Sequence, residues 1–402
     1  MMLLFLLLKT LFLLAVLGVS YVILNWELAN TIPVNAKTGK PLSLANLTIV
    51  ELDRQAHFVT LRSSADPSQL AKHQVPVLLI LHGGPGLSDI PFLYETDFLL
   101  ENNFVVARYD QRSAGKSCRF YNVHHPLTLE EHIEDGIAMA EYLKDRFWQE
   151  KIFLAGRSWG ATLALGMAKQ RPDLFQFVAV WGTPVHGIKN NLMAKADLPM
   201  LPYDGDFEKM TKHESWVTKA GGVYHTHPKA WVTRLATSIA QHYGVHQYIY
   251  WTYTLVSPEF SWADLTRVFS CWEHTTKELA PAVQNYDAYN EVDELKVPVV
   301  FIHGRHDHLS TVELAEDYFK AFKAPWKKFL WFEQSGHFAD RDEPVLFQET
   351  LIKTFLETTT AEIAISEKSS SEEEESDDGA EEEEEEEEVS TGTPGGGPME
   401  EL

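Results

Sequence analysis

The chain has 402 residues, of which 45% are hydrophobic and 23% are charged, and its formal net charge is -24. This composition supplies a large buried core and excludes a small scaffold held together by disulfides. Residues 359–402 contain 18 acidic residues and one lysine, so they carry -17 of the charge and the remainder carries only -7. The rest of the chain has no basic stripe that would follow a phosphate backbone, and we expect no nucleic-acid partner.

The C-terminal segment, residues 359–402, includes eight consecutive glutamates from Glu381 and ends in a stretch rich in Gly, Pro, Ser and Thr. It cannot bury enough apolar surface to offset the entropy cost of ordering, so we expect a disordered acidic tail. Two roles stay open for this tail. It either increases solubility as a solvated segment or binds a basic partner.

Residues 1–24 are almost wholly apolar, with Lys9, Thr10 and Ser20 as the polar interruptions. About 20 apolar residues in a helix span the hydrocarbon core of a membrane. We therefore expect a single-pass signal-anchor, with a cleaved signal peptide for the secretory pathway and a buried core helix as alternatives. The sequon at residues 46–48 is consistent with a luminal or extracellular domain.

Two cysteines, Cys118 and Cys271, are too few for a disulfide framework and lack the spacing of metal ligands. We expect free thiols, and a single bridge between them is the alternative.

Short apolar runs at residues 47–52 and 57–62 predict a leading β-hairpin. Continuous apolar runs, typical of strands buried on both faces, then alternate with helical patterns. The strands are expected at residues 76–81, 104–109, 151–155 and 177–180, and the helices at residues 128–145 and 161–171. This alternation predicts a parallel sheet built of βαβ units.

A G-x-S-x-G motif occupies residues 156–160, between a predicted strand and a predicted helix. This layout is typical of a nucleophile elbow, in which a sharp turn exposes the hydroxyl of Ser158. The flanking glycines, Gly156 and Gly160, are expected because the turn is strained and brings strand and helix close together.

The sequence His-Gly-Gly-Pro-Gly at residues 82–86 follows directly after the strand at 76–81. Its glycines allow backbone N–H groups to face a ligand, so we expect an oxyanion donor from Gly84, with Gly83 as the alternative, and a second donor from Trp159. The Asp-Gln-Arg sequence at residues 110–112 follows the next strand. We expect it to support the mouth of the site through side-chain hydrogen bonds.

Taken in this order and spacing, the motifs at 82–86, 110–112 and 156–160 resemble the α/β-hydrolase family that contains the proline iminopeptidases. The resemblance covers about residues 45–358. It implies an α/β-hydrolase fold, with a mostly parallel central sheet, helices on both faces and an inserted, mostly helical cap. The core then consists of residues 45–184 and 291–358, and the cap of residues 185–290.

Two residues depart from this family's pattern. Ser113 stands where the family usually has glycine, and we expect a slightly altered loop there. Arg157 stands where the family commonly has glycine or histidine, and we expect it to narrow the pocket entrance or give it charge.

The expected cap is rich in aromatic residues, most of which we expect to pack the cap against the core. Within it, the dipeptide Trp272-Glu273 resembles a Trp-Glu element of the family. The resemblance implies that Glu273 binds the ammonium group of a substrate, and a surface glutamate beside a buried tryptophan is the alternative. His225 and His227 are expected in a solvated turn.

After the cap, strands are expected at 297–302 and 328–332, and helices at 311–321 and 344–358. Asp307 follows the first of these strands, where the fold places the acid that orients the catalytic histidine. His337 follows the last strand, in a Ser-Gly-His sequence that resembles the family's histidine loop. A metal site at 303–308 is the competing interpretation, but ligands this dense in one loop seldom converge on one ion.

Ser158, Asp307 and His337 occur in the order that an α/β-hydrolase requires. They predict a serine hydrolase that works through an acyl-enzyme and needs no metal or organic cofactor. The resemblance implies an aminopeptidase that releases an N-terminal proline or another small residue from peptides. The alternatives are a carboxylesterase or lipase with the same triad, and a catalytically idle fold that binds partners through its acidic tail.

Overall fold

The computed structural model describes residues 31–357, except Ala36, 53–54, 122–124, Pro126, 191–192, 194–253 and 255–256, and also Val16. Most of the predicted N-terminal membrane segment and cap, including His225 and His227, and all of the acidic tail lie outside the described residues. The predictions for these segments therefore stay predictions. Within the described part of the chain, no helix is long and apolar enough to cross a membrane.

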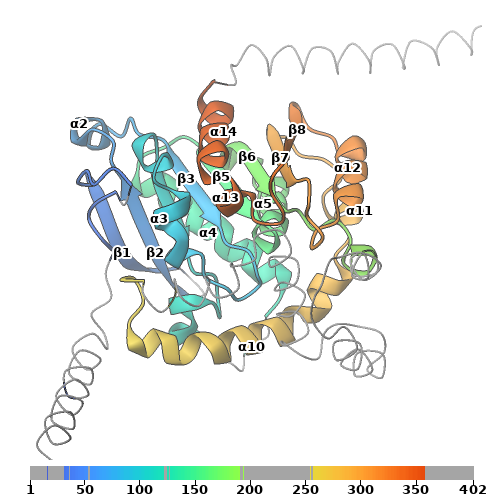
Figure 1. Ribbon diagram of the computed structural model, residues 1–402, viewed down its shortest axis with the longest axis horizontal. Coiled ribbons are helices and arrows are strands. Elements are labelled where there is room, and N and C mark those ends of the chain that lie inside the picture. The colour runs from blue at the N-terminus through green and yellow to red at the C-terminus, as the bar shows by residue number, and fades with distance from the viewer. Residues whose placement is uncertain are drawn as a thin grey trace, which may run out of the picture. The chain divides into compact units, whose positions relative to one another are not determined.

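An eight-stranded sheet forms the centre of the described chain, in the order β1-β2-β4-β3-β5-β6-β7-β8 (Figure 1). β2 pairs antiparallel with both β1 and β4, and all other neighbours are parallel. The predicted hairpin and the mostly parallel sheet are thus confirmed. The strands are β1 (Leu44–Glu51), β2 (Ala56–Ser63), β3 (Val77–Leu81), β4 (Val105–Tyr109), β5 (Ile152–Arg157), β6 (Phe175–Trp181), β7 (Val299–Gly304) and β8 (Lys327–Phe332).

Helices follow most of the parallel strands, as the βαβ pattern predicted. The α-helices are α2 (Pro67–Ala71), α3 (Leu93–Thr96), α4 (Leu129–Arg146), α5 (Trp159–Gln170), α10 (Trp262–Asn285), α11 (Ala288–Glu291), α12 (Val312–Ala321), α13 (Ala339–Asp342) and α14 (Pro344–Glu357). Short 3-10 helices are η1 (Ile90–Phe92), η2 (Leu100–Asn102), η3 (Gly115–Phe120) and η4 (Pro172–Leu174).

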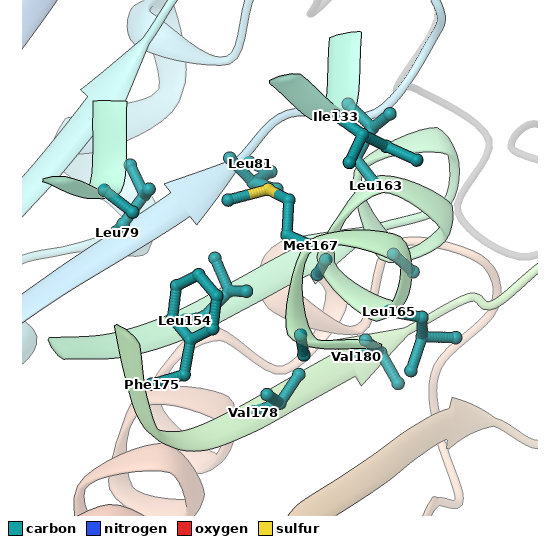
Figure 2. Close-up of a cluster of buried hydrophobic side chains, with 14 of the residues drawn as sticks. Leu79, Leu81, Ile133, Leu154, Leu163, Leu165, Met167, Phe175, Val178 and Val180 are labelled. Atoms are coloured by element: carbon teal, nitrogen blue, oxygen red, sulfur yellow. The ribbon is translucent and has the colours of Figure 1, made fainter. Parts of the chain in front are cut away.

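Both faces of the central strands are buried. Leu79 of β3 belongs to an apolar cluster that includes Ile133 of α4 and Met167 of α5 (Figure 2). The next residue back, Leu78, belongs to a second cluster that contains Phe347 of α14. Since successive strand residues point to opposite faces, a strand covered on both sides must be apolar throughout. Helices on both faces therefore account for the continuous apolar runs.

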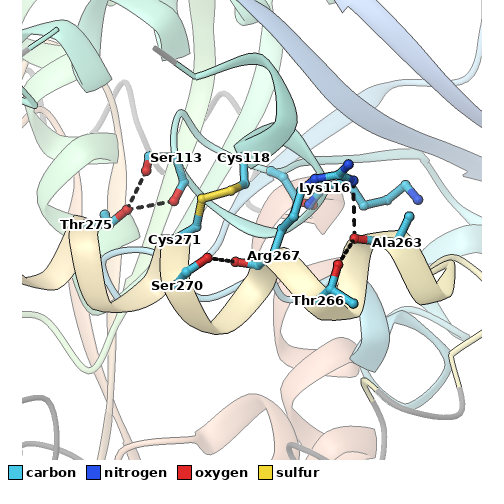
Figure 3. The surroundings of a disulfide bond; sticks show 10 residues. Ser113, Lys116, Cys118, Ala263, Thr266, Arg267, Ser270, Cys271 and Thr275 are labelled. Carbon is cyan, nitrogen blue, oxygen red and sulfur yellow. Dashed lines mark hydrogen bonds between the residues drawn. A yellow bond between two sulfur atoms is a disulfide. The ribbon is translucent and has the colours of Figure 1, made fainter. Parts of the chain in front are cut away.

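The described part of the predicted cap is dominated by α10, which is covalently joined to the core (Figure 3). Cys118 of η3 and Cys271 of α10 form a disulfide, with their Cα atoms 6.1 Å apart. The expectation of free thiols was wrong. The two cysteines are 153 residues apart in the sequence, so only the folded chain brings them within bonding distance.

Removing this disulfide is expected to lower the stability of the protein. A bridge that closes so long a loop restricts the unfolded chain, and such bridges typically contribute about 2–5 kcal/mol. We expect the double variant Cys118→Ser, Cys271→Ser to unfold about 3–8 °C below the wild type in a thermal melt followed by circular dichroism.

Reductant supplies the control for this measurement. Dithiothreitol should lower the melting temperature of the wild type to that of the double variant and leave the double variant unchanged. Equal melting temperatures for the oxidised wild type and the double variant would show that the bridge adds nothing to stability.

Candidate active site

The turn at Ser158 has the backbone of the predicted elbow. Ser158 lies between β5 and α5 with φ 53° and ψ -118°, a backbone region that residues other than glycine rarely adopt. A Cβ atom on Gly156 would lie 2.2 Å from the carbonyl oxygen of Gly160, and one on Gly160 would lie 2.3 Å from that of Leu81. Glycine is therefore required at both positions, and the strained serine stands at the carboxyl edge of the sheet.

Asp307 and His337 meet directly, although they follow different strands. The imidazole Nδ1 of His337 lies 2.9 Å from Oδ2 of Asp307. The other carboxylate oxygen accepts backbone N–H bonds from Leu309 at 2.8 Å and Ser310 at 2.9 Å. Burial alone would raise the pKa of Asp307, but the His337 imidazole, then His303 and the Ser310 N–H, lower it overall. The carboxylate is thus fixed in place and ionised.

The end of β6 brings Ser158 and His337 to one place. The N–H of Ser158 donates to the carbonyl of Trp181 at 2.9 Å. The next residue, Gly182, has φ 54°, and a Cβ atom there would lie 2.9 Å from Cε1 of His337. The residues beside the pair also touch, since the Arg157 guanidinium lies 4.7 Å from the ring centre of Phe338. The three predicted triad residues therefore lie at one edge of the sheet.

Gly182→Ala is expected to displace His337. The added methyl group would collide with the imidazole, and misplacement by about 1 Å can cost up to about 100-fold in rate. We expect kcat/KM to fall by about 10–100-fold in an assay with an arylamide or ester substrate. Gly39→Ala is the matched control, because Gly39 also has a positive φ, 67°, but has nothing within 4 Å of the added Cβ atom. Activity of Gly182→Ala within about twofold of that control would contradict the collision.

The loop at residues 82–86 is held by His82 and Gln111. His82 donates through Nδ1 to the Gly83 carbonyl at 2.8 Å and accepts at Nε2 from the backbone N–H of Gln111 at 3.0 Å. Burial lowers the pKa of His82 to about 4, so the ring is neutral. The Gln111 side chain donates to the His82 carbonyl and accepts from the Trp159 indole N–H. Gln111 thus supports the site through hydrogen bonds, as the sequence predicted.

Two of the three predicted oxyanion donors lie beside Ser158. Trp159 is the first residue of α5, so its backbone N–H has no acceptor within the helix. A Cβ atom on Gly83 would lie 3.4 Å from Cβ of Ser158, which places this loop beside the elbow. Gly84, with φ 133°, adopts a backbone conformation that favours glycine. Their role as donors stays a prediction.

Ser113 occupies a left-handed backbone position, with φ 56°, which explains why glycine suits this place. Thr275 of α10 compensates for the strain, because its hydroxyl donates to the Ser113 carbonyl at 2.6 Å and lies 2.8 Å from the Ser113 hydroxyl. The same threonine contacts the loop at residues 82–86, since a Cβ atom on Gly86 would lie 2.9 Å from its Cβ. One threonine of α10 therefore supports two loops of the site.

The expectation that Arg157 gives the entrance charge was wrong, because its side chain is buried and its guanidinium pairs with the carboxylates of Asp89 and Asp340. That Arg157 narrows the entrance stays a prediction. Glu273 has an exposed side chain on α10, and its ammonium-binding role stays a prediction.

No cluster of His, Cys, Asp or Glu among the residues that the structure describes could hold a metal. In the loop at 303–308, which was the alternative metal site, His303 instead hydrogen-bonds the Ser310 carbonyl at 2.8 Å.

Sequence reasoning missed the carboxylates that hold the His337 loop. Asp342 accepts the N–H of Gly336 at 2.9 Å, and Glu343 accepts the Ser335 hydroxyl at 2.6 Å. Burial raises the pKa of Asp342 to about 7. The acidic stretch directly after the histidine was the available signal, because short loops are often closed by such side-chain to backbone bonds.

Known proteins resemble this chain over most of its length. A family model described as serine aminopeptidase, S33, matches residues 72–342. A probable aminopeptidase of Bacillus subtilis is 28% identical over 295 residues, which cover 69% of this chain and 87% of that protein. A proline iminopeptidase of Neisseria gonorrhoeae is 25% identical over 304 residues, covering 66% and 83%. The crystal structure of a proline iminopeptidase from Mycobacterium smegmatis superposes with a TM-score of 0.55 at 18% identity, covering 77% and 97%.

Proposed function

The chain belongs to the serine aminopeptidase S33 family and has the α/β-hydrolase fold, and from this premise we propose that it is a serine hydrolase that removes an N-terminal residue, foremost proline, from small peptides. The main support for this proposal is the hydrogen bond between His337 and Asp307. It lies at the edge of the sheet where Ser158 has a strained backbone conformation. The aminopeptidase and the proline iminopeptidase among its relatives support the choice of substrate.

The proposed chemistry follows from the nitrogen that Asp307 leaves available. Because Nδ1 of His337 bonds the carboxylate, Nε2 takes the proton of the Ser158 hydroxyl as its oxygen attacks the substrate carbonyl. Asp307 stabilises the resulting imidazolium. His337 then protonates the leaving amine, and a water molecule activated by the same imidazole hydrolyses the acyl-enzyme.

The oxyanion that forms during attack needs donors that are already in place. We assign this role to the backbone N–H groups of Trp159 and Gly84, with Gly83 as the alternative to Gly84. The first lies at the N-terminus of α5, where the helix dipole also favours negative charge. Each such donor typically contributes about 3 kcal/mol to transition-state stabilisation.

Glu273 is the carboxylate that we propose for the substrate ammonium. An aminopeptidase must distinguish a free N-terminal amine from a blocked one, and a carboxylate does so by charge. Glu273→Gln should then raise KM for a free-amine arylamide by about 10-fold or more. Turnover unchanged within a few fold would assign amine recognition to another residue.

Location is a separate proposal. We propose that residues 1–24 attach the chain to a membrane, or direct it to the secretory pathway if they are cleaved. The disulfide between Cys118 and Cys271 supports an oxidising compartment, where such bonds persist. Fractionation of the full-length protein into membrane and soluble pools, before and after deletion of residues 1–24, tests this.

A substrate panel tests the proposed activity. Purified protein is offered prolyl, alanyl and leucyl arylamides with free amines, the N-acetylated prolyl arylamide, and short and long acyl esters. We expect turnover of the free prolyl arylamide and loss of at least about 100-fold with the acetylated one. Turnover of esters alone would indicate a carboxylesterase or lipase. A folded protein that turns over nothing and resists a fluorophosphonate probe would be an idle fold.

A further inference from the structure

Arg157 lies one residue before Ser158, and its guanidinium is buried between two carboxylates. Its Nη2 donates to both oxygens of Asp89, at 2.6 and 2.9 Å, and its Nη1 donates to Asp340 at 3.3 Å. The planar guanidinium presents its donors in a rigid fork, which suits contact with two acids at once. One buried cation therefore links two segments that are distant in the sequence.

The first carboxylate lies just after the loop at residues 82–86, which we call the oxyanion loop. Asp89 lies three residues after Gly86, the last residue of that loop, and it is buried. Arg341 of α13 also donates to Asp89, at 2.7 Å. Burial opposes ionisation, but the guanidiniums of Arg157 and Arg341 hold the pKa of Asp89 at about 2. The segment after the loop is thus fixed by two ion pairs at neutral pH.

The second carboxylate lies at the start of α13, directly after the His337 loop at residues 333–338. Asp340 lies three residues after His337 and is also buried. Its other oxygen accepts the indole N–H of Trp181 at 3.0 Å, and the Arg157 guanidinium covers the ring of Phe338. Arg157 therefore contacts the residue that follows His337 as well as the carboxylate at the start of α13.

A gain in stability alone does not explain why these charged groups are buried together. Two guanidiniums and two carboxylates balance in charge, but a buried ion pair is often no more stabilising than well-packed apolar residues of similar volume. In some proteins such a pair is kept for the geometry that it defines. The segments that this cluster links are the one directly after the oxyanion loop and the one directly after the His337 loop.

We propose that Arg157 is a positioning residue that holds the oxyanion loop and the His337 loop at the spacing around Ser158 that acyl transfer needs. It does so through Asp89 and Asp340. The inference rests on the proposed function, because Arg157 acts only through Ser158, His337 and the backbone donors.

Arg157→Lys tests the proposal, since lysine keeps the charge but cannot contact both carboxylates with a planar fork. With the best substrate of the wild type, we expect kcat to fall by about 10–100-fold and KM to change by less than about threefold. The second-order rate of labelling by a fluorophosphonate should fall in parallel with kcat, because it reports the same attack by Ser158.

Arg62→Lys is the matched control. Arg62 is equally buried and pairs with Glu101 at 2.6 Å. It lies beside Val106 near the start of β4, and so at the end of the strands opposite the site. We expect kcat and labelling within about threefold of wild type for this variant. Equal losses in the two variants, or an Arg157→Lys enzyme within about threefold of wild type, would overturn the proposal.

Asp340→Asn provides the second variant if Arg157→Lys does not fold. The amide oxygen keeps the bond from Trp181, but the charge facing Arg157 is lost. We expect kcat to fall by about 10-fold or more, and an unchanged kcat would overturn the proposal. Wild-type protein that fluorophosphonate does not label at Ser158 overturns the proposed function and this inference together. Labelled wild type with equally labelled Arg157→Lys overturns this inference alone.

Discussion

Ser158→Ala is expected to abolish turnover, lowering kcat by about 10⁴-fold or more. Without the hydroxyl no acyl-enzyme forms, and only the residual acceleration from binding and oxyanion donors remains. The measurement is the rate with the best substrate of the panel, together with fluorophosphonate labelling followed by mass spectrometry of the intact protein. The wild type should gain one adduct, and the variant none.

Ser270→Ala is the control for this variant. Ser270 has an exposed side chain on α10, where its hydroxyl bonds the Arg267 carbonyl within the same helix. Its loss should change neither activity nor labelling. Labelling that persists in Ser158→Ala at the wild-type rate would place the nucleophile elsewhere and refute the proposed triad.

Asp307→Asn is expected to lower kcat by about 10⁴-fold while the protein stays folded. The amide has nearly the shape of the carboxylate and can still accept the N–H groups of Leu309 and Ser310. It cannot hold a proton on Nδ1 of His337 or stabilise the imidazolium. The imidazole then presents the wrong tautomer to the Ser158 hydroxyl.

The pH dependence of the wild type and a matched surface variant serve as the controls for Asp307→Asn. In the wild type, the lowered pKa of Asp307 keeps the carboxylate ionised at and above neutral pH, so this group should cause no loss of activity there. Asp317→Asn, on the exposed face of α12, should behave as the wild type does. If Asp307→Asn kept more than about a tenth of wild-type kcat, another group would have to orient His337.

The sequence predicted the sheet well because its signals are local. Continuous apolar runs marked β3, β4, β5 and β7, and each run follows from burial on both faces of a strand. The elbow at Ser158 could also be predicted, since the backbone there requires glycine two residues before and two residues after the serine. Likewise, the carboxyl ends of β7 and β8 located Asp307 and His337, because functional groups in this fold follow the strands.

The tertiary structure alone decided which distant side chains meet. Arg157 pairs with residues 68 and 183 positions away, and Cys118 bonds a cysteine 153 positions away. The spacing of these residues in the sequence does not predict such contacts, because sheet order and helix packing determine which residues so far apart come together. The sequence by itself therefore determined the strands, the elbow and the order of Ser158, Asp307 and His337. The fold decided the disulfide and the buried charge of Arg157, since both depend on how the separate βα units come together.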